Sequence, residues 1–331
     1  MKEQIEKFID DELKELLQVK GVISPRNIEE EICRLLMRAK FRRKAASNSL
    51  KKRVQEAVAY NVSNDEPINI TFLQGCYKLW RFEESPEADW AEFFALMHYA
   101  TWVKPILSFY KPGVIFDFFV DDLIMEKISN LRRDEILSYQ SSFQKIINFV
   151  MSHCPKNLHC KITTVSSRYS NESDFWDKLN TAVENWEKPE NIKLDEMRIA
   201  TIELNYRPIP NENHSALWRE KIARIYAAHA AMENRLKYRE KIGKILAMPH
   251  HYDGFDTRIF LGSTKDSNIK YWIGVGALKH KNEDFIPTVL SPSQLANVKF
   301  STHNVAIKGL DTKNFKKIRV INTDVNQGVR K

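Results

Sequence analysis

The stretch Val114–Val120, which reads VIFDFFV and is followed by two aspartates, decides the fold of this chain. It is almost continuously apolar, which is typical of a parallel strand that helices cover on both faces. Pro112 and Gly113 end the element before it, and Asp121 and Asp122 end the strand itself. The segment therefore predicts a central, buried strand in the parallel sheet of an α/β protein.

Helices and further strands are expected on both sides of this stretch. Asp89 and Glu92 form an acidic relative of the capping box, which predicts a helix from there to about Tyr110. Other expected elements are a strand at 68–73, a helix at 134–152, a strand at 160–165, a helix at 172–186, a strand at 197–206 and a long helix at 215–246. Because strands alternate with helices, a mainly parallel sheet is predicted.

The two ends of the chain differ from this middle part. Residues 1–60 are expected to form a helical lead-in, with Ser24 and Pro25 as one helix start. Glycine-punctuated apolar runs after residue 257 predict a β-rich C-terminal third. We therefore expect a helical segment at 1–60 and an α/β domain at 61–331, with a joint near 188–195.

Composition places the chain among ordinary globular proteins. Of its 331 residues 43% are hydrophobic and 28% are charged. No apolar stretch approaches the ~20 residues of a membrane span, and the charged N-terminus lacks the apolar core of a signal peptide. Four scattered cysteines without a CxxC pair predict no disulfide framework and no zinc ribbon. A soluble, cytoplasmic protein with reduced thiols and no membrane partner is expected.

The positive charge is concentrated in one segment. The net charge is +8, and nine basic residues but no acidic one lie between Arg34 and Arg53. Such a segment binds polyanions weakly or forms a solvated helix face. It also supports one alternative function, a nucleic-acid-binding protein that uses residues 34–53 on an α/β scaffold.

The strand end supplies the first candidate site. In open α/β sheets, ligands bind at the carboxyl ends of the strands, which is where Asp121 and Asp122 lie. They could transfer protons or hold Mg²⁺ or Mn²⁺, and Asp117 could join them from the same sheet face. The opposing interpretation is that Asp122 caps the next helix and Asp121 is solvated.

Two other groups of residues could bind an anion. GCYKLWR at 75–81 follows the strand at 68–73, so Lys78 and Arg81 could clamp a phosphate, or Lys78 could form a Schiff base. The turn at 262–265, Gly-Ser-Thr-Lys, offers hydroxyl groups and a cation for phosphate oxygens. Both stretches also suit ordinary structural roles, a surface lysine beside aromatic residues and a simple turn.

Three motifs in the middle of the chain follow one another in a characteristic order. PEADWAEFFAL at 86–96, SFYKPGVIFDFFVDD at 108–122 and ILSYQSSFQKI at 136–146 follow one another. This order resembles the central region of the isonitrile (isocyanide) synthase family, which includes the pyoverdine-cluster isonitrile synthases and the dityrosine spore-wall proteins. KFSTHNVAI at 299–307 is similar to the family's "TPWHNV" strand, and Met232 to His250 is similar to its "M..R…RLSIHP" segment.

The resemblance implies a Rossmann-like fold and a reaction. The family converts the amino group of an aromatic amino acid to an isonitrile with a carbon from ribulose 5-phosphate, without a metal or redox cofactor. On that basis the partners are an amino acid and a sugar phosphate. The candidate catalytic residues are Lys78, Asp121 and His303, and the candidate substrate-binding residues are Arg81, Glu92, Asp122, Arg235, His250, Arg258, Ser263, Thr264, Lys265 and Asn304. The enzymatic alternative is a metal-dependent sugar or nucleotide transferase that uses Asp121 and Asp122.

Overall fold

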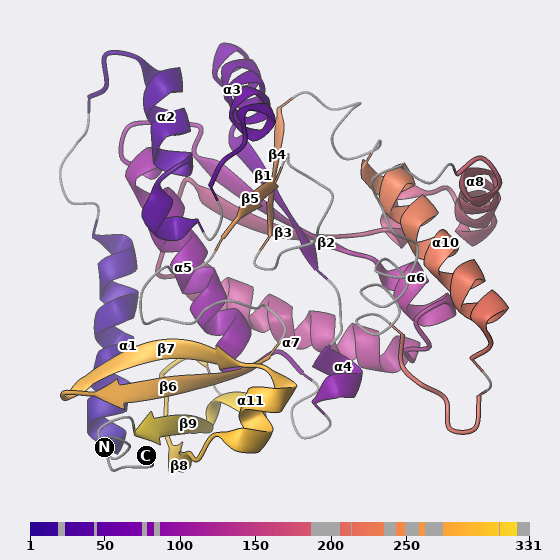
Figure 1. Cartoon of the computed structure of the whole chain (residues 1–331). Helices are drawn as coiled ribbons and strands as arrows, with labels where there is room; N and C mark the ends of the chain where they lie inside the picture. The colour runs from indigo at the N-terminus through magenta and orange to yellow at the C-terminus, as the bar shows by residue number, and fades with distance from the viewer. Residues whose placement is uncertain are drawn as a thin grey trace, which may run out of the picture.

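The computed structural model describes residues 1–18, 24–42, 45–74, 78–82, 87–186, 206–212, 214–234, 243–248, 258–261, 274–310 and 312–322. In this part of the chain two separate sheets form, and helix α5 (Trp90–Leu107) lies between them (Figure 1). The N-terminal helices lie along the same side of the molecule as α5. The fold is thus α/β, with the parallel sheet and the β-rich C-terminal part that the sequence predicts.

The first sheet is parallel throughout its described strands. Its order is β3-β2-β1-β4-β5, with the bounds β1 Ile68–Gln74, β2 Val114–Val120, β3 Leu158–Thr164, β4 Lys244–Met248 and β5 Arg258–Phe260. This is the order of a Rossmann-like sheet, in which the chain begins near the middle and winds outward in both directions. Strand β2 is buried and has a parallel neighbour on each side, which confirms the prediction for VIFDFFV.

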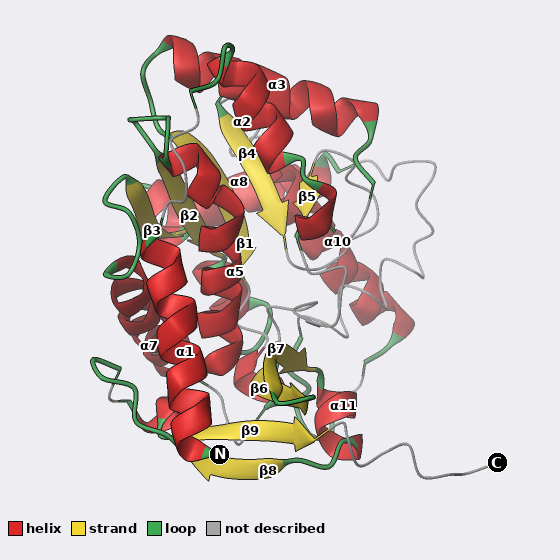
Figure 2. Ribbon diagram, turned by 90° about the vertical axis from the view of Figure 1, so that its left-hand side faces the viewer, coloured by secondary structure: helices red, strands yellow, loops and turns green. Residues whose placement is uncertain are grey.

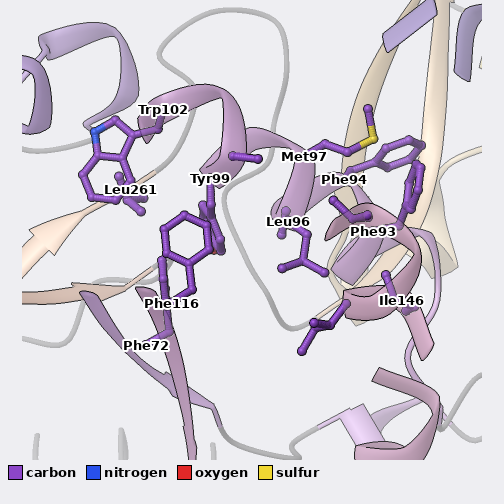
Figure 3. Close-up of a cluster of buried hydrophobic side chains, with 14 of the residues drawn as sticks. Phe72, Phe93, Phe94, Leu96, Met97, Tyr99, Trp102, Phe116, Ile146 and Leu261 are labelled. Carbon is purple, nitrogen blue, oxygen red and sulfur yellow. The ribbon is translucent and has the colours of Figure 1, made fainter. Parts of the chain in front are cut away.

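One face of this sheet is apolar and packs on helices α5 and α7 (Arg133–Met151). Phe72 of β1 stacks on Tyr99 of α5 with ring centroids 4.6 Å apart, and Phe118 of β2 meets Phe143 of α7 edge to face. Figure 3 shows Phe72 and Phe116 grouped with Tyr99 at this contact. Burial of these rings provides the main apolar contact of the sheet.

The opposite face of the sheet is polar at its centre. Thr71, Asp117 and Lys161 are register partners on β1, β2 and β3, so their side chains leave the sheet on the same side. Further along that face, Phe119 packs into a second cluster with helices α6 (Asp122–Lys127), α8 (Glu172–Glu184) and α10 (Ala216–Asn234). Figure 1 shows α8 and α10 side by side, and in Figure 2, which is turned by 90°, α8 lies behind the strands of the sheet.

The N-terminal segment is helical, as expected. It consists of α1 (Lys2–Leu17), α2 (Ile28–Leu36), the short 3-10 helix η1 (Ala39–Phe41) and α3 (Asn48–Ser63). Helices α1 and α2 pack on α5, and α3 packs on β1 and β4. The predicted helix start at Ser24 is wrong by three residues, because Asn27 is the residue whose side chain accepts the amide hydrogen bond of Glu30.

The second sheet is mixed and has the order β7-β6-β9-β8. Its strands are β6 (Val275–Lys281), β7 (Asp284–Leu290), β8 (Ser301–Asn304) and β9 (Lys317–Asn322), with helix α11 (Pro292–Asn297) between β7 and β8. Gly276 of β6 runs against the start of α5, where a Cβ atom would lie 2.3 Å from the Cβ of Trp90. Only glycine allows this approach of the strand to the helix.

One predicted helix is too long. A continuous helix was expected from Ser215 to Leu246, but α10 is Ala216–Asn234 and Lys244–Met248 form strand β4. Ile245 and Leu246 pair with β1, a contact across 175 residues that no local pattern reveals. Of the strand expected at 197–206, residues 197–205 lie outside the described residues, as does the proposed joint.

Candidate active site

A buried charged cluster occupies the start of α5. Lys78, the first residue of the short helix α4 (Lys78–Arg81), places its Nζ 2.7 Å from Asp89 Oδ1 and 3.0 Å from Glu92 Oε2. The Tyr139 hydroxyl of α7 donates to Glu92 Oε1 at 2.9 Å. The side chain of Lys78 is only 2% exposed, and Glu92 is fully buried. Ion pairs enclosed to this degree hold the joined elements in one geometry.

The same carboxylates cap helix α5. Asp89 accepts from the Ala91 amide and Glu92 accepts from the Asp89 amide, which confirms the predicted capping box. Burial raises the pKa of Glu92, and the neighbouring Asp89 charge raises it further. Gly276 of the second sheet also donates its backbone N–H to Asp89. The cluster therefore joins α4, α5, α7 and the second sheet.

The two aspartates after β2 have different partners. Asp122 is the first residue of α6, and its carboxylate accepts the backbone N–H and the hydroxyl of Ser166 after β3. Asp121 is at the N-cap position, but its side chain makes no capping hydrogen bond and is 25% exposed. Neither aspartate caps α6 through its side chain, so the interpretation of Asp122 as a cap is wrong.

Asp121 lies beside a buried histidine. His229 of α10 places Nε2 4.0 Å from Asp121 Oδ1, and its ring packs edge to face against Phe175 of α8. A carboxylate that orients an imidazole is a common arrangement for proton transfer near neutral pH. Sequence reasoning missed His229, which had no signal beyond its own residue type inside a predicted helix.

Asp117 is the centre of a third polar group. It is fully buried, and its Oδ1 accepts the hydroxyl of Thr163 at 2.6 Å. The nitrogen atoms of Lys161, Arg168 and Lys244 lie 3.7, 3.9 and 3.6 Å from Oδ2. Sequence reasoning named Asp117 but not these three basic residues, which come from β3, the 3-10 helix η2 (Ser166–Arg168) and β4.

The other predicted residues lie elsewhere or are not described. His303 and Asn304 are on β8, the edge strand of the second sheet, where His303 Nε2 is 2.8 Å from Ser301 Oγ. Arg81 ends α4 and Arg258 begins β5, and only their backbone is described. Five predicted residues lie outside the described part of the chain: Arg235, His250, Ser263, Thr264 and Lys265.

Several residues of the basic segment bind their own chain. Arg34 pairs with Glu31, Arg38 donates to the carbonyls of Leu35 and Trp102, and Arg42 donates to the carbonyl of Met37. Burial lowers the pKa of Arg38. Polyanion binding by this segment stays a prediction. Because these three arginines have partners within the chain, fewer charges are available to a polyanion than the sequence indicates.

Two further observations on the described residues concern membrane-spanning helices and metal sites. None of the helices described is long and apolar enough to cross a membrane. Among the same residues, no group of three or more His, Cys, Asp or Glu side chains is arranged to hold a metal ion.

The parallel strand order and the polar residues after β2 define an α/β protein of the Rossmann-like class. Among solved structures, this chain is similar to the PvcA protein from Pseudomonas aeruginosa, with a TM-score of 0.56 and 14% identity over 89% of this chain and 100% of that one. PvcA is a pyoverdine-cluster isonitrile synthase, so the predicted resemblance to that family is confirmed at the level of the fold. No family model matches the chain, and no curated protein matches it by sequence.

Proposed function

We propose that this protein is an enzyme of the isonitrile-synthase type, which condenses the amine of an amino acid with a phosphorylated sugar such as ribulose 5-phosphate. The fold match to PvcA and the order of the motifs around VIFDFFV support this assignment. A condensation of this kind needs a group that takes a proton from the amine and returns one to the sugar oxygen.

The pair of Asp121 and His229 carries the proposal. It lies at the carboxyl end of the central strand, where α/β proteins bind their ligands, and Asp121 is the member that reaches solvent. In our assignment Asp121 accepts the proton of the substrate amine. His229, which is buried behind it, orients the Asp121 carboxylate.

Lys78 has a positioning role in this scheme. Its ammonium is enclosed by Asp89 and Glu92, so we assign it to fixing α4 against α5 rather than to contact with substrate. His303 and Asn304 remain candidate substrate residues. A metal-dependent transferase is less well supported, because both oxygens of Asp122 already accept hydrogen bonds from Ser166.

Turnover by three proteins tests the proposal. The wild type is incubated with a panel of amino acids and ribulose 5-phosphate, and isonitrile formation is followed by mass spectrometry. Asp121→Asn keeps the size of the side chain and removes its charge, so turnover should fall ~10²–10⁴-fold. Asp134→Asn, at an exposed site on α7, is the matched control and should keep full activity. No isonitrile from any substrate pair, or normal turnover by Asp121→Asn, would contradict the proposal.

A further inference from the structure

We propose that the surface formed by strands β8 and β9 binds single-stranded nucleic acid. The two strands are neighbours at one border of the second sheet, and Figure 2 shows them at the lower end of the molecule, below the parallel sheet. The inference goes beyond the proposed function, because it concerns a different sheet from the one that carries Asp121 and requires binding without turnover.

The first argument is an excess of exposed positive charge. Residues 285–310 and 312–322 contain six Lys or Arg residues and no Asp or Glu. Glu6 and Glu87 contact this segment by accepting hydrogen bonds from Ala306 and Asn314, but the positive charge still exceeds the negative charge. Five of the six basic residues have no ion pair with a carboxylate of the described chain: Lys299, Lys308, Lys313, Lys317 and Arg319. A surface with unneutralised cations of this kind attracts a polyanion.

The basic segment at 34–53 differs in this respect. Its arginines Arg34, Arg38 and Arg42 donate to acceptors of their own chain. The basic residues of the second sheet are therefore more available to a ligand than these arginines are. We accordingly place nucleic-acid binding on the second sheet and use the basic segment as the control.

The second argument is that polar side chains of β8 and β9 share one face of the sheet. Ile318 of β9 is buried in the main core, so its neighbours Lys317 and Arg319 lie on the opposite side. Thr302 and Asn304 of β8 are the register partners of Arg319 and Lys317, and they share that side. Helix α11 packs on the part of the sheet that belongs to β7 and leaves Thr302, Asn304 and Lys317 exposed. Adjacent strands thus present cations for phosphates and hydrogen-bonding groups for bases.

The third argument selects single-stranded nucleic acid among polyanions. Phe300 directly precedes β8, and the guanidinium of Arg319 lies 5.7 Å from the centre of its ring. Phe300 is 39% exposed, and within the described residues 274–310 and 312–322 it is the one exposed large apolar side chain. Unpaired bases stack on an exposed ring beside cations, whereas the bases of a duplex already stack on each other. A membrane-binding surface needs a larger apolar area than one ring.

Fluorescence anisotropy of a labelled oligonucleotide tests the surface. We expect the wild type to bind oligothymidylate of about 20 nucleotides at low salt, and to bind a duplex of the same length more weakly. The double variant Lys317→Gln with Arg319→Gln should weaken binding at least tenfold and make the affinity less dependent on salt concentration. The matched control is Lys51→Gln with Lys52→Gln, which removes two exposed lysines of the basic segment and should bind as the wild type does.

A third variant separates stacking from charge. Phe300→Ala removes the ring on which a base would stack, so the affinity should fall about tenfold. Its salt dependence should equal that of the wild type, because no phosphate contact is lost. Circular dichroism checks that all variants are folded, which we expect because the changed side chains lie at the surface.

The outcomes distinguish this inference from other ligands and from the proposed function. Absence of oligonucleotide binding, or an equal loss in the two double variants, would overturn the inference. Binding to vesicles that contain phosphatidylserine without binding to the oligonucleotide would overturn it in favour of a lipid surface. Equal affinity for the single strand and the duplex would contradict the stacking on Phe300. Asp121→Asn should bind the oligonucleotide normally, so the result holds even if no isonitrile forms.

Discussion

The two faces of the parallel sheet are built in opposite ways. On one face, Phe72 and Phe118 pack against aromatic rings of α5 and α7. On the other, Thr71, Asp117 and Lys161 occupy the neighbouring positions of the same strands. Each strand therefore contributes alternately to a rigid apolar core and to a charged surface.

Because of this difference, the two faces should contribute unequally to the stability of the protein. Close-packed rings fix the strand positions, because any loss of volume leaves a cavity. The polar face buries oxygen atoms and basic groups, which does not favour folding by itself. Stability should thus depend mainly on the first face, and four substitutions or conditions test that division.

The largest effect is expected on the apolar face. Phe118→Ala removes a fully buried ring that contacts Phe72 and Phe143, so the free energy of unfolding should fall by about 3–5 kcal/mol. Urea unfolding followed by circular dichroism measures the change. Phe300→Ala, at a partly exposed phenylalanine, is the matched control. A similar loss of stability in both variants would show that the packing of Phe118 against α7 contributes no more to stability than the partly exposed Phe300 does.

A buried histidine on α5, the helix that covers the apolar face, should make the stability of the protein sensitive to acid. His98 has a buried Nε2, and burial lowers its pKa to about 4. Between about pH 6.5 and pH 4 the unfolded chain takes up a proton that the folded one refuses, so stability should fall by up to about 3 kcal/mol as the pH drops. The difference between the urea midpoints at pH 7 and pH 4.5 should be smaller for His98→Leu than for the wild type. The exposed His159→Leu should keep the wild-type difference.

A smaller effect is expected from charge removal on the polar face. Asp117→Asn keeps the shape and an acceptor for Thr163 but withdraws the negative charge from Arg168 and Lys244, so unfolding should become easier by about 1–3 kcal/mol. Urea unfolding of this variant is compared with that of Thr163→Val, which keeps the charge. A more stable Asp117→Asn variant would mean that the buried carboxylate lowers the stability of the wild-type protein.

The smallest effect on stability belongs to Lys161. Its ion pair with Asp117 is long and half exposed, so Lys161→Gln should change the free energy of unfolding by less than about 1 kcal/mol. Thermal unfolding of the variant and of the wild type measures the change. A large loss of stability would show that the polar face also holds the sheet together, which contradicts the difference between the two faces.

Local sequence patterns were sufficient for much of the fold. The apolar run of β2 and the capping box of α5 depend on neighbouring residues, and both were predicted correctly. Strand β4 was assigned to a helix, because Lys244–Met248 gains its strand form from pairing with β1 far away in the sequence. Patterns within one segment carry no information about such a pairing.

The candidate site was less predictable for the same reason. Asp121 was found from its place after a strand, but its partner His229 lies on a helix 108 residues later. One signal was present: Thr71, Asp117 and Lys161 are each the fourth residue of a seven-residue strand. The strand predicted at 160–165 begins two residues late, so aligning the predicted strands places Thr71 beside Asp117 but leaves Lys161 out of register.

The contact between α5 and the second sheet has a consequence for synthesis of the chain. Trp90 donates its indole N–H to the carbonyl of Lys317, and Asp89 accepts from Gly276. On the ribosome, Asp89 emerges 187 residues before Gly276, and Trp90 emerges 227 residues before Lys317. Until then the start of α5 exposes an indole ring, and its cap lacks one donor. Nascent chains stalled before residue 274 should therefore be the form of this protein that chaperones bind most readily.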